Sequence, residues 1–237
     1  MQGFLKEGAL ARADAFAAEA DGLEALRPHI RVPEVLERGV RSGKAYIRLE
    51  LLHLQRTGDW NELGRMLAHL HRQTGARFGW MRDNYIGLSP QQNSWCDDWM
   101  EFWVQRRMEP QIAWARDKGF EVSMPPMRLL EKHRPQPSLL HGDLWGGNAG
   151  FTAEGPVIFD PAVYYGDRET DLAMTELFGG FPREFYRAYD EAFPLQPGYE
   201  KRKHLYNLYH LLNHLNIFGG GYLAQVRATL RLLAGLL

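Results

Sequence analysis

The pattern of apolar and polar positions divides the chain into a mixed amino-terminal part and a mostly helical remainder. Apolar residues at helical spacing predict a helix over residues 14–26. Two short strands are predicted over residues 32–40 and 45–51, and residues 41–44 form the turn of a hairpin with a longer loop. Residues 3–6 read as the end of another strand, so the first fifty residues combine helix and sheet.

Beyond this part, the periodicity is mainly helical. It predicts helices over residues 61–74, 94–118, 168–178, 183–193, 201–218 and 222–236. Pro110 is expected to kink or split the second of these helices, because proline lacks the N–H group that a helix interior needs. Short strands over 138–140 and 156–159 flank a glycine-rich loop. Strands and helices do not alternate regularly, so we expect an α+β fold of two lobes, residues 1–55 and 56–237.

Composition narrows the class of protein. The 237 residues carry 28 basic and 29 acidic side chains, a net charge of −1, which argues against a nucleic-acid partner. No apolar run is long enough to predict a membrane span, and the first residues lack the apolar segment of a signal peptide. The single cysteine, Cys96, excludes an intramolecular disulfide and a multi-cysteine zinc site. We expect a cytoplasmic enzyme, and nothing in the sequence indicates its oligomeric state.

The densest chemistry lies in the segment HGDLWGGN, residues 141–148, followed by the apolar strand that leads to Asp160. A carboxylate, Asp143, is followed five residues later by an amide, Asn148, and then by the second carboxylate. Phosphoryl transfer from ATP uses these residue types: one aspartate orients the attacking hydroxyl, while an asparagine and another aspartate hold magnesium. Protein kinases space their catalytic aspartate and asparagine in the same way.

Two other interpretations fit part of this segment. His-Gly-Asp alone is a weak signal, because Gly-Asp is common in turns. A metal hydrolase could use His141 with Asp160, Asp167 and Asp171 as further ligands. That alternative requires clustered histidines, and the sequence has none nearby, so a kinase is favoured.

Longer motifs point to a particular family. HGDLWGGN, DPAVYYGDRETDLAMTELFGGF and LYNLYHLLNHLNIFGGGY together resemble the fructosamine-3-kinase (ketosamine-3-kinase) family, within the aminoglycoside and choline kinase-like group. Upstream, LGRMLAHLH and FGWMRDNYIGLSPQQNSWCDDWMEFW match the same family. The resemblance runs from about Phe4 to Tyr222 and implies a protein-kinase-like fold with a shortened amino-terminal sheet and a mostly helical carboxy-terminal lobe.

The resemblance implies ATP- and Mg²⁺-dependent phosphorylation of the 3-hydroxyl of a ketosamine, on protein lysines or small amines, as deglycation repair. It implies these roles: Asp143 as catalytic base; Asn148 and Asp160 as magnesium ligands; Lys6 on the ATP phosphates, paired with Glu19; Glu50, Leu51 and Leu52 as the hinge that binds adenine. Trp145, Tyr164 and Tyr165 are candidates for stacking on the sugar. The alternatives are another small-molecule kinase of the aminoglycoside phosphotransferase type and a non-catalytic pseudokinase.

Several of these positions have ordinary structural explanations. A lysine near a terminus and a glutamate on an amphipathic helix are usually solvated charges, and the apolar hinge residues could simply close a core. Aromatic residues are more often core than substrate contacts. His210 and His214 lie one helical turn apart and could bind a metal, but the family's use of that segment looks structural.

The sequence departs from the family pattern at its start. The family fold begins with two more strands joined by a glycine-containing phosphate loop, and only five residues precede Lys6. Either the start site lies further upstream, or this is a short form with weak or no catalysis. The presence of all five catalytic residue types favours the first explanation. We expect the chain of 237 residues to bind ATP weakly and to transfer phosphate slowly or not at all, and an upstream segment to raise both.

Overall fold

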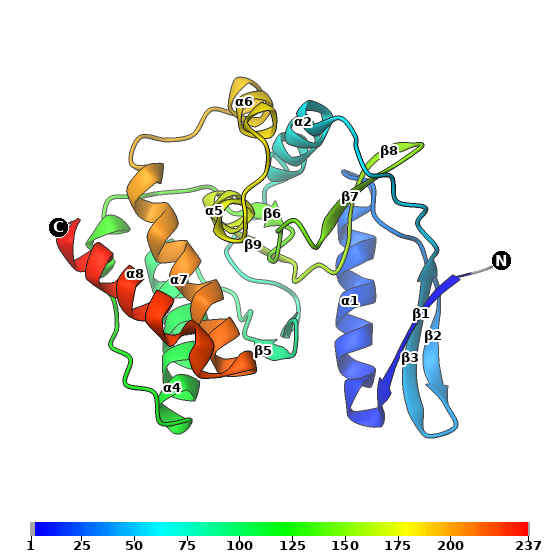
Figure 1. The fold of residues 1–237 in the computed structure, drawn as a ribbon, viewed down its shortest axis with the longest axis horizontal. Coiled ribbons are helices and arrows are strands. Elements are labelled where there is room, and N and C mark those ends of the chain that lie inside the picture. Colours follow the sequence, from blue (N-terminus) through cyan, green and yellow to red (C-terminus); the bar gives the residue numbers. More distant parts are fainter. Residues whose placement is uncertain (1–2, 237) are drawn as a thin grey trace.

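The computed structural model describes residues 3–236, and a small antiparallel sheet with one helix forms one end of the molecule (Figure 1). The elements of this end are β1 (Gly3–Ala9), α1 (Ala13–Leu26), β2 (Val35–Arg41) and β3 (Lys44–Glu50). The strand order is β1-β3-β2. Every second residue of β3 is buried, namely Ala45, Ile47 and Leu49, because alternate side chains of a strand point to one face. This face packs against α1, as the sequence pattern predicts.

The turn between β2 and β3 is tighter than expected. Arg41 pairs with Lys44, so only Ser42 and Gly43 form the loop, with φ angles of 51° and 74°. Two consecutive residues with positive φ match the right-handed twist of a two-residue hairpin. The prediction of a longer loop was therefore wrong, whereas both strands were found within a few residues of their predicted bounds.

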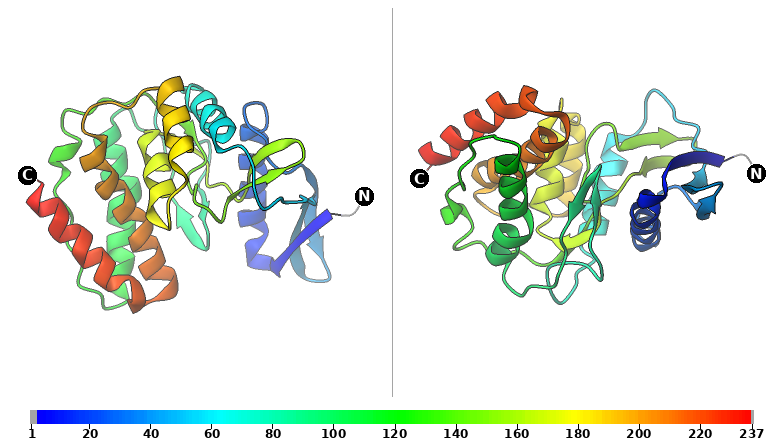
Figure 2. Two further views of the ribbon diagram at one scale, coloured as in Figure 1. Left: turned by 45° about the horizontal axis from the view of Figure 1, so that its top comes forward. Right: turned by 90° about the horizontal axis from the view of Figure 1, so that it is seen from below.

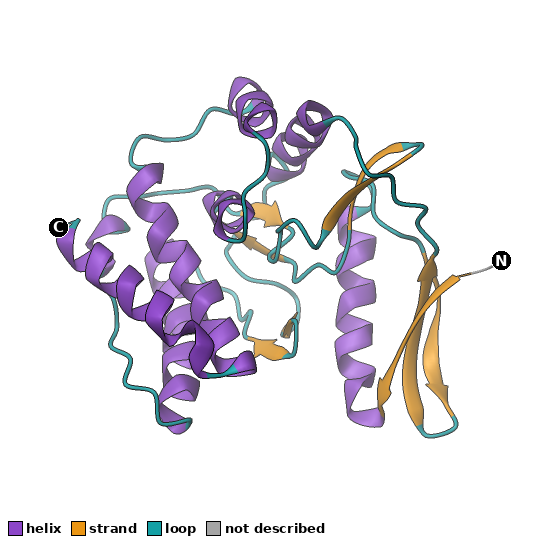
Figure 3. Cartoon of the chain, viewed as in Figure 1, coloured by secondary structure: helices purple, strands orange, loops and turns teal. Residues whose placement is uncertain are grey.

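The other end of the molecule is mainly helical (Figures 2 and 3). Its α-helices are α2 (Trp60–His71), α3 (Trp99–Trp103), α4 (Glu109–Asp117), α5 (Glu169–Leu177), α6 (Arg183–Ala192), α7 (Tyr199–Phe218) and α8 (Leu223–Gly235). Short 3₁₀ turns occupy Leu10–Arg12, Met127–Leu129 and Gly220–Tyr222. Helix α7 packs against α4, α5 and α8 at the centre of this part. Among helices of residues 3–236, none has both the length and the apolar character that a bilayer crossing requires.

The predicted helix over 94–118 begins later and is not uniform. It starts at α3, widens into a π-helical segment at Val104–Met108 and continues as α4. Pro110, near the start of α4, cannot donate to the carbonyl four residues earlier, which belongs to Arg106. The guanidinium of Arg107 donates to that carbonyl at 3.0 Å instead. Proline therefore disturbs the helix as predicted, and the disturbance is a local widening.

Three two-stranded antiparallel sheets complete the fold. Their strands are β4 (Asn84–Ile86) with β5 (Ser89–Gln91), β6 (Ser138–Leu140) with β9 (Tyr164–Gly166), and β7 (Ala149–Thr152) with β8 (Gly155–Ile158). The sequence pattern predicted β6 and most of β8, and it missed their partners. The missed strands are as short as the predicted ones, but none of them contains two adjacent aliphatic residues, as β6 does at Leu139–Leu140 and β8 at Val157–Ile158.

Helices α2 and α6 pack closely at Gly64. A Cβ atom at this position would lie 2.4 Å from the carbonyl oxygen of Phe185 and 3.1 Å from the amide nitrogen of Tyr189. The side chain of Asp59 begins α2 by accepting hydrogen bonds from the amides of Asn61 and Glu62. Glycine therefore permits a backbone contact that fixes α6 beside α2.

Candidate active site

The catalytic-loop sequence follows β6 directly, and glycine shapes its first turn. Gly142 has φ of 83°, and a Cβ there would lie 2.1 Å from the carbonyl oxygen of Ala162. The Ala162 amide in turn donates to the His141 carbonyl at 2.8 Å. Only glycine fits this left-handed, crowded position, which places Asp143 at the entrance of the site.

A buried carboxylate on α5 holds this loop. The backbone amides of His141 and Gly142 donate to Oδ2 and Oδ1 of Asp171, both at 2.8 Å. The Nε2 atom of His71, on α2, lies 3.1 Å from Oδ2 of the same carboxylate. Burial alone would raise the pKa of Asp171, but the hydrogen bond and charge of His71 hold that pKa below its ordinary value. Asp171 therefore stays charged and fixes the loop.

Asp143, the predicted catalytic base, lies against Asn148. Its Oδ2 atom is 3.5 Å from Nδ2 of Asn148, and the same amide group donates to the backbone carbonyl of Asp143 at 2.8 Å. Burial, together with the charges of Asp171 and Asp160, raises the pKa of Asp143 to about 7. A carboxylate with a pKa near neutrality can both accept and release a proton at physiological pH.

The β7–β8 hairpin brings the two predicted magnesium ligands side by side. The amide of Phe159 donates to the carbonyl of Asn148 at 3.0 Å, so Asn148 lies opposite the residue before Asp160. Asp160 has φ of 58°, a rare conformation for a residue with a side chain. Nδ2 of Asn148 donates to Asp143, and the amide oxygen of Asn148 accepts no hydrogen bond from any described residue. An amide oxygen beside a carboxylate is the donor set that Mg²⁺ prefers, so these residues fit the ion.

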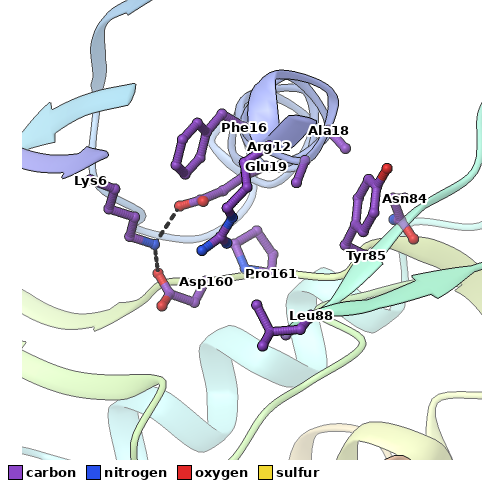
Figure 4. Close-up of a pocket in the computed structure, with 12 residues that line it drawn as sticks. Lys6, Arg12, Phe16, Ala18, Glu19, Asn84, Tyr85, Leu88, Asp160 and Pro161 are labelled. Carbon is purple, nitrogen blue, oxygen red and sulfur yellow. Dashed lines mark hydrogen bonds and ion pairs between the residues drawn. The ribbon is translucent and has the colours of Figure 1, made fainter. Parts of the chain in front are cut away.

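Strand β1 and helix α1 contribute an ion-pair cluster to the same place. The Nζ atom of Lys6 lies 2.7 Å from Oε1 of Glu19 and 2.6 Å from Oδ1 of Asp160 (Figure 4). The pair of Lys6 with Glu19 was predicted and is confirmed. Burial opposes the charge on Lys6, but the two carboxylates raise its pKa overall. Burial outweighs Lys6 in its effect on Glu19, whose pKa is also raised.

An apolar cavity of about 290 Å³ adjoins this cluster. Its lining consists of Phe4, Lys6, Pro33, Leu49, Glu50, Leu51, Leu52, Leu54, Phe159 and Asp160. The carboxylate of Glu50 pairs with Arg31 at 2.6 Å, so only its backbone and stem face the cavity. Within residues 3–236, no hydrogen bond reaches the backbone of Leu51 or Leu52. An apolar cavity bounded by Lys6 and Asp160 is suited to the base of a nucleotide whose phosphates lie at these two residues.

The three predicted substrate aromatics have different surroundings. Trp145 is 37% exposed beside the catalytic aspartate and contacts Phe178 edge to face. Tyr164 is only 2% exposed, and the guanidinium of Arg107 lies 4.1 Å from its ring centre. The prediction that Tyr164 stacks on a sugar was wrong, because its ring is sealed in the core. Tyr165 points to the opposite face of β9, where it packs against Trp80, so we do not place it in the site.

Two structural groups escaped sequence reasoning. Asp171 had been considered only as a ligand of the metal-hydrolase alternative, yet its oxygens are occupied by the loop amides and His71. Asp167 is likewise engaged by His133 at 2.7 Å and by the hydroxyl of Tyr206. Both carboxylates have structural partners, and His133, which contacts Asp167, was not among the ligands of the hydrolase alternative, so the structure does not assemble that ligand set. The only sequence feature that sets Asp171 apart is its place in the first turn of a helix. Its partners could not be predicted from the sequence, because they lie 29 to 100 residues away.

The architecture agrees with that of known phosphotransferases. At 17% identity, an aminoglycoside-3′-phosphotransferase of type VIII superposes with a TM-score of 0.53, over 89% of this chain and 84% of its own length. This likeness concerns the fold alone. With the geometry above, it defines a phosphotransferase of the protein-kinase-like fold class.

More similar proteins identify the family. The fructosamine kinase family model matches residues 1–234, so the chain belongs to the fructosamine kinase family. A Synechocystis protein named "Probable ketoamine kinase" is 48% identical over 91% of this chain and 77% of its own length. A chloroplastic protein-ribulosamine 3-kinase of Arabidopsis thaliana is 43% identical over 87% of this chain and 68% of its own. A crystal structure from Haemophilus somnus, assigned to the fructosamine-3-kinases, has a TM-score of 0.91 at 31% identity, over 98% of this chain and 83% of that one.

Proposed function

We propose that the chain is an ATP-dependent ketosamine 3-kinase, which phosphorylates the 3-hydroxyl of a sugar ketosamine carried by a protein lysine or a small amine. The observation that carries this proposal is the placement of Lys6 and Asp160 at the edge of an apolar cavity, with Asn148 paired to the neighbouring Phe159 and in contact with Asp143. Family membership and the names of the relatives point to ketosamines as the acceptor class. The proposed reaction type therefore rests on the geometry of this chain, and the proposed substrate class rests on the family and its named relatives.

In this proposal the nucleotide base occupies the apolar cavity, where the backbone of Glu50 to Leu52 offers hydrogen bonds. Lys6, held by Glu19, neutralises phosphate charge. Asn148 and Asp160 hold magnesium, which when bound screens the charge that develops on the transferred phosphoryl group. Residues 1–55 and 56–237 then act as two lobes with the nucleotide between them.

Asp143 handles the proton. The ketosamine 3-hydroxyl lies against its carboxylate, the O–H bond breaks as the new O–P bond forms, and Asp143 accepts the proton. The bond between the terminal phosphorus of ATP and its bridging oxygen breaks as the phosphoryl group passes to the ketosamine, ADP is the leaving group, and the proton passes from Asp143 to solvent. A pKa of about 7 suits both steps. Trp145, half-exposed beside this residue, offers an aromatic face to the apolar side of the sugar.

The test is product analysis with competing acceptors. The protein is incubated with ATP, magnesium and an equimolar mixture of a fructosamine, a ribulosamine and an aminoglycoside, and the products are separated by mass spectrometry. We expect the phosphoryl group on the ketosamines. Transfer to the aminoglycoside instead would replace the proposal by an aminoglycoside-type kinase. Nucleotide binding without transfer to any acceptor would replace the proposal by the non-catalytic pseudokinase alternative.

A further inference from the structure

His210, on the face of α7 that points to the catalytic loop, has an unexplained polar atom. The residue is only 3% exposed, and its Nδ1 atom has no hydrogen-bond partner within residues 3–236. An unpaired buried nitrogen destabilises the folded protein, because it has lost its hydrogen bonds to water. His214, one turn further along, has no such deficit, because its Nδ1 atom bonds the carbonyl of His210 at 2.8 Å. A buried imidazole that lacks a partner therefore needs another explanation than packing.

The unpaired atom is directed at the catalytic aspartate. Nδ1 of His210 lies 3.9 Å from Oδ1 of Asp143. This separation is about 1 Å too long for a hydrogen bond and too short to hold a water molecule between the two atoms. The other carboxylate oxygen of Asp143 is also loosely held, at 3.5 Å from Nδ2 of Asn148. Hydrogen bonds of catalytic groups are often long in the free enzyme and shorten only when the substrates are bound.

The protonation state of the His210 ring is compatible with a hydrogen-bond donor at Nδ1. Burial, reinforced by the neighbouring His214, lowers the pKa of His210 to about 3. The ring is therefore neutral and carries one N–H group and one acceptor nitrogen. With a carboxylate facing Nδ1, the tautomer that places the hydrogen on Nδ1 is favoured, because the other would set two acceptors against each other.

We propose that His210 is a positioning residue for the catalytic base: its Nδ1–H group donates to Oδ1 of Asp143 when the substrates are bound, which turns Oδ2 towards the reacting hydroxyl. The assignment of Asp143 as the base rests on the proposed function, whereas the role of His210 rests on its distance from Asp143. A shift of about 1 Å in the carboxylate is enough to form the bond, and misplacement of that size can change a rate by about 100-fold.

Three substitutions separate this role from packing. His210→Phe keeps a ring of similar size and removes both nitrogens, so kcat should fall by about 10- to 100-fold while the KM for ATP stays unchanged. Because it also removes an unpaired buried nitrogen, its melting temperature should equal or exceed that of the wild type. His210→Asn places an amide N–H near the position of Nδ1 and should restore most of kcat. His210→Gln carries its amide one bond further out and should not.

The decisive experiment combines His210→Phe with Asp143→Asn in a double-mutant cycle. If His210 acts through Asp143, adding the phenylalanine to the Asp143→Asn variant should lower kcat no further. A further fall by the same factor as in the wild type, or wild-type kcat in His210→Phe alone, would overturn the proposal. The matched control is His204→Phe, on the same helix, which should leave kcat unchanged.

The cycle is measured both on ketosamine phosphorylation and on the slow hydrolysis of ATP by water, which needs the same base. If the wild type phosphorylates no ketosamine, the proposed function fails and the hydrolysis data still test His210. If the wild type does phosphorylate ketosamines and His210→Phe is equally fast, only the inference about His210 fails.

Discussion

At the scale of single residues, the account depends on how burial changes the pKa of one carboxylate, that of Asp143. Asp143 is surrounded by protein and faces the charges of Asp171 and Asp160, and its pKa is raised to about 7. The neighbouring Asp171 is even more buried, but loop amides and His71 keep it ionised. In this account the two nearby carboxylates have opposite tasks: Asp143 is proposed to exchange a proton, and Asp171 holds the loop.

The raised pKa predicts how stability depends on pH. Between about pH 4 and pH 7 the folded protein retains a proton on Asp143 that the unfolded chain has released, so stability should fall as the pH rises through this range. Asp143→Asn has no such proton to lose. We expect this variant to be more stable than the wild type by roughly 2–4 kcal/mol at pH 8 and similar to it at pH 4.

Urea unfolding of both proteins at the two pH values, without magnesium, measures this difference. The control is Asp117→Asn, at the end of α4 and outside the site. An Asp143→Asn variant that gains nothing at pH 8 would show that the carboxylate is not strained by burial.

The proposed magnesium role of Asp160 makes a separate prediction. Asp160→Ala should weaken binding of ATP with magnesium far more than binding of ATP alone, because the carboxylate acts through the ion. Calorimetric titration with and without magnesium compares the two. Equal losses in both titrations would assign Asp160 only to its ion pair with Lys6, which lies at 2.6 Å.

Sequence reasoning succeeded at this scale where a residue's role is local in sequence. Asp143 and Asn148 lie five residues apart, and their contact through Nδ2 of the asparagine follows from that spacing. It failed for Tyr164, because an aromatic residue beside a catalytic segment faces either the cleft or the core, and only the packing of Arg107 decides between them. The pair of Lys6 with Glu19 was found through the family resemblance, since thirteen residues of separation carry no signal of contact.

At the scale of elements, long amphipathic helices were predictable and short strands were not. Helix α1 was found within one residue of its predicted bounds, because Phe16, Leu23 and Leu26 recur at helical spacing and are all buried. Strands β7 and β9 depend on partners elsewhere in the chain and have little pattern of their own. The π-helical segment was foreseen only as a disturbance around Pro110, since its form depends on the guanidinium of Arg107.

The contact between α2 and α6 gives a prediction at this scale. Gly64→Ala would place a Cβ atom 2.4 Å from the carbonyl oxygen of Phe185 and force the helices apart. We expect a loss of about 1–3 kcal/mol in the free energy of unfolding. Gly235→Ala is the matched control, because a Cβ there would meet no atom within 4 Å. Urea midpoints of the two variants measure the effect, and an unaltered midpoint for Gly64→Ala would mean that this contact is not tight.

At the scale of the whole molecule, the active site joins segments from both ends of the chain. Lys6 and Asp160 are 154 residues apart in sequence, and their ion pair links strand β1 to the loop after β8. In Figure 1 the sheet and α1 lie at one end and the helices around α7 at the other, with the β7–β8 hairpin above α1. The general two-part order of the chain was predictable from its change of periodicity, but the way these segments meet was not, because it depends on contacts distant in sequence.

This arrangement predicts that ligand binding stabilises the entire protein. At 100 times its dissociation constant, ATP with magnesium should add about 2.7 kcal/mol to the free energy of unfolding. Lys6→Met removes one of the groups that connect the two ends, so the same ligand concentration should stabilise this variant less. Thermal melts with and without ATP and magnesium measure both values. Equal stabilisation of the two proteins would exclude Lys6 from the nucleotide site.

The central claim is that this fold transfers phosphate from ATP to the 3-hydroxyl of a ketosamine with Asp143 as base. The most direct measurement is a ³¹P–¹H correlation spectrum of the product formed from a ribulosamine, by the wild type and by Asp143→Asn. The account predicts phosphate on the oxygen of carbon 3 and a rate about 10²- to 10⁴-fold lower for the folded variant. Phosphate on another oxygen, or a variant as fast as the wild type, would contradict it.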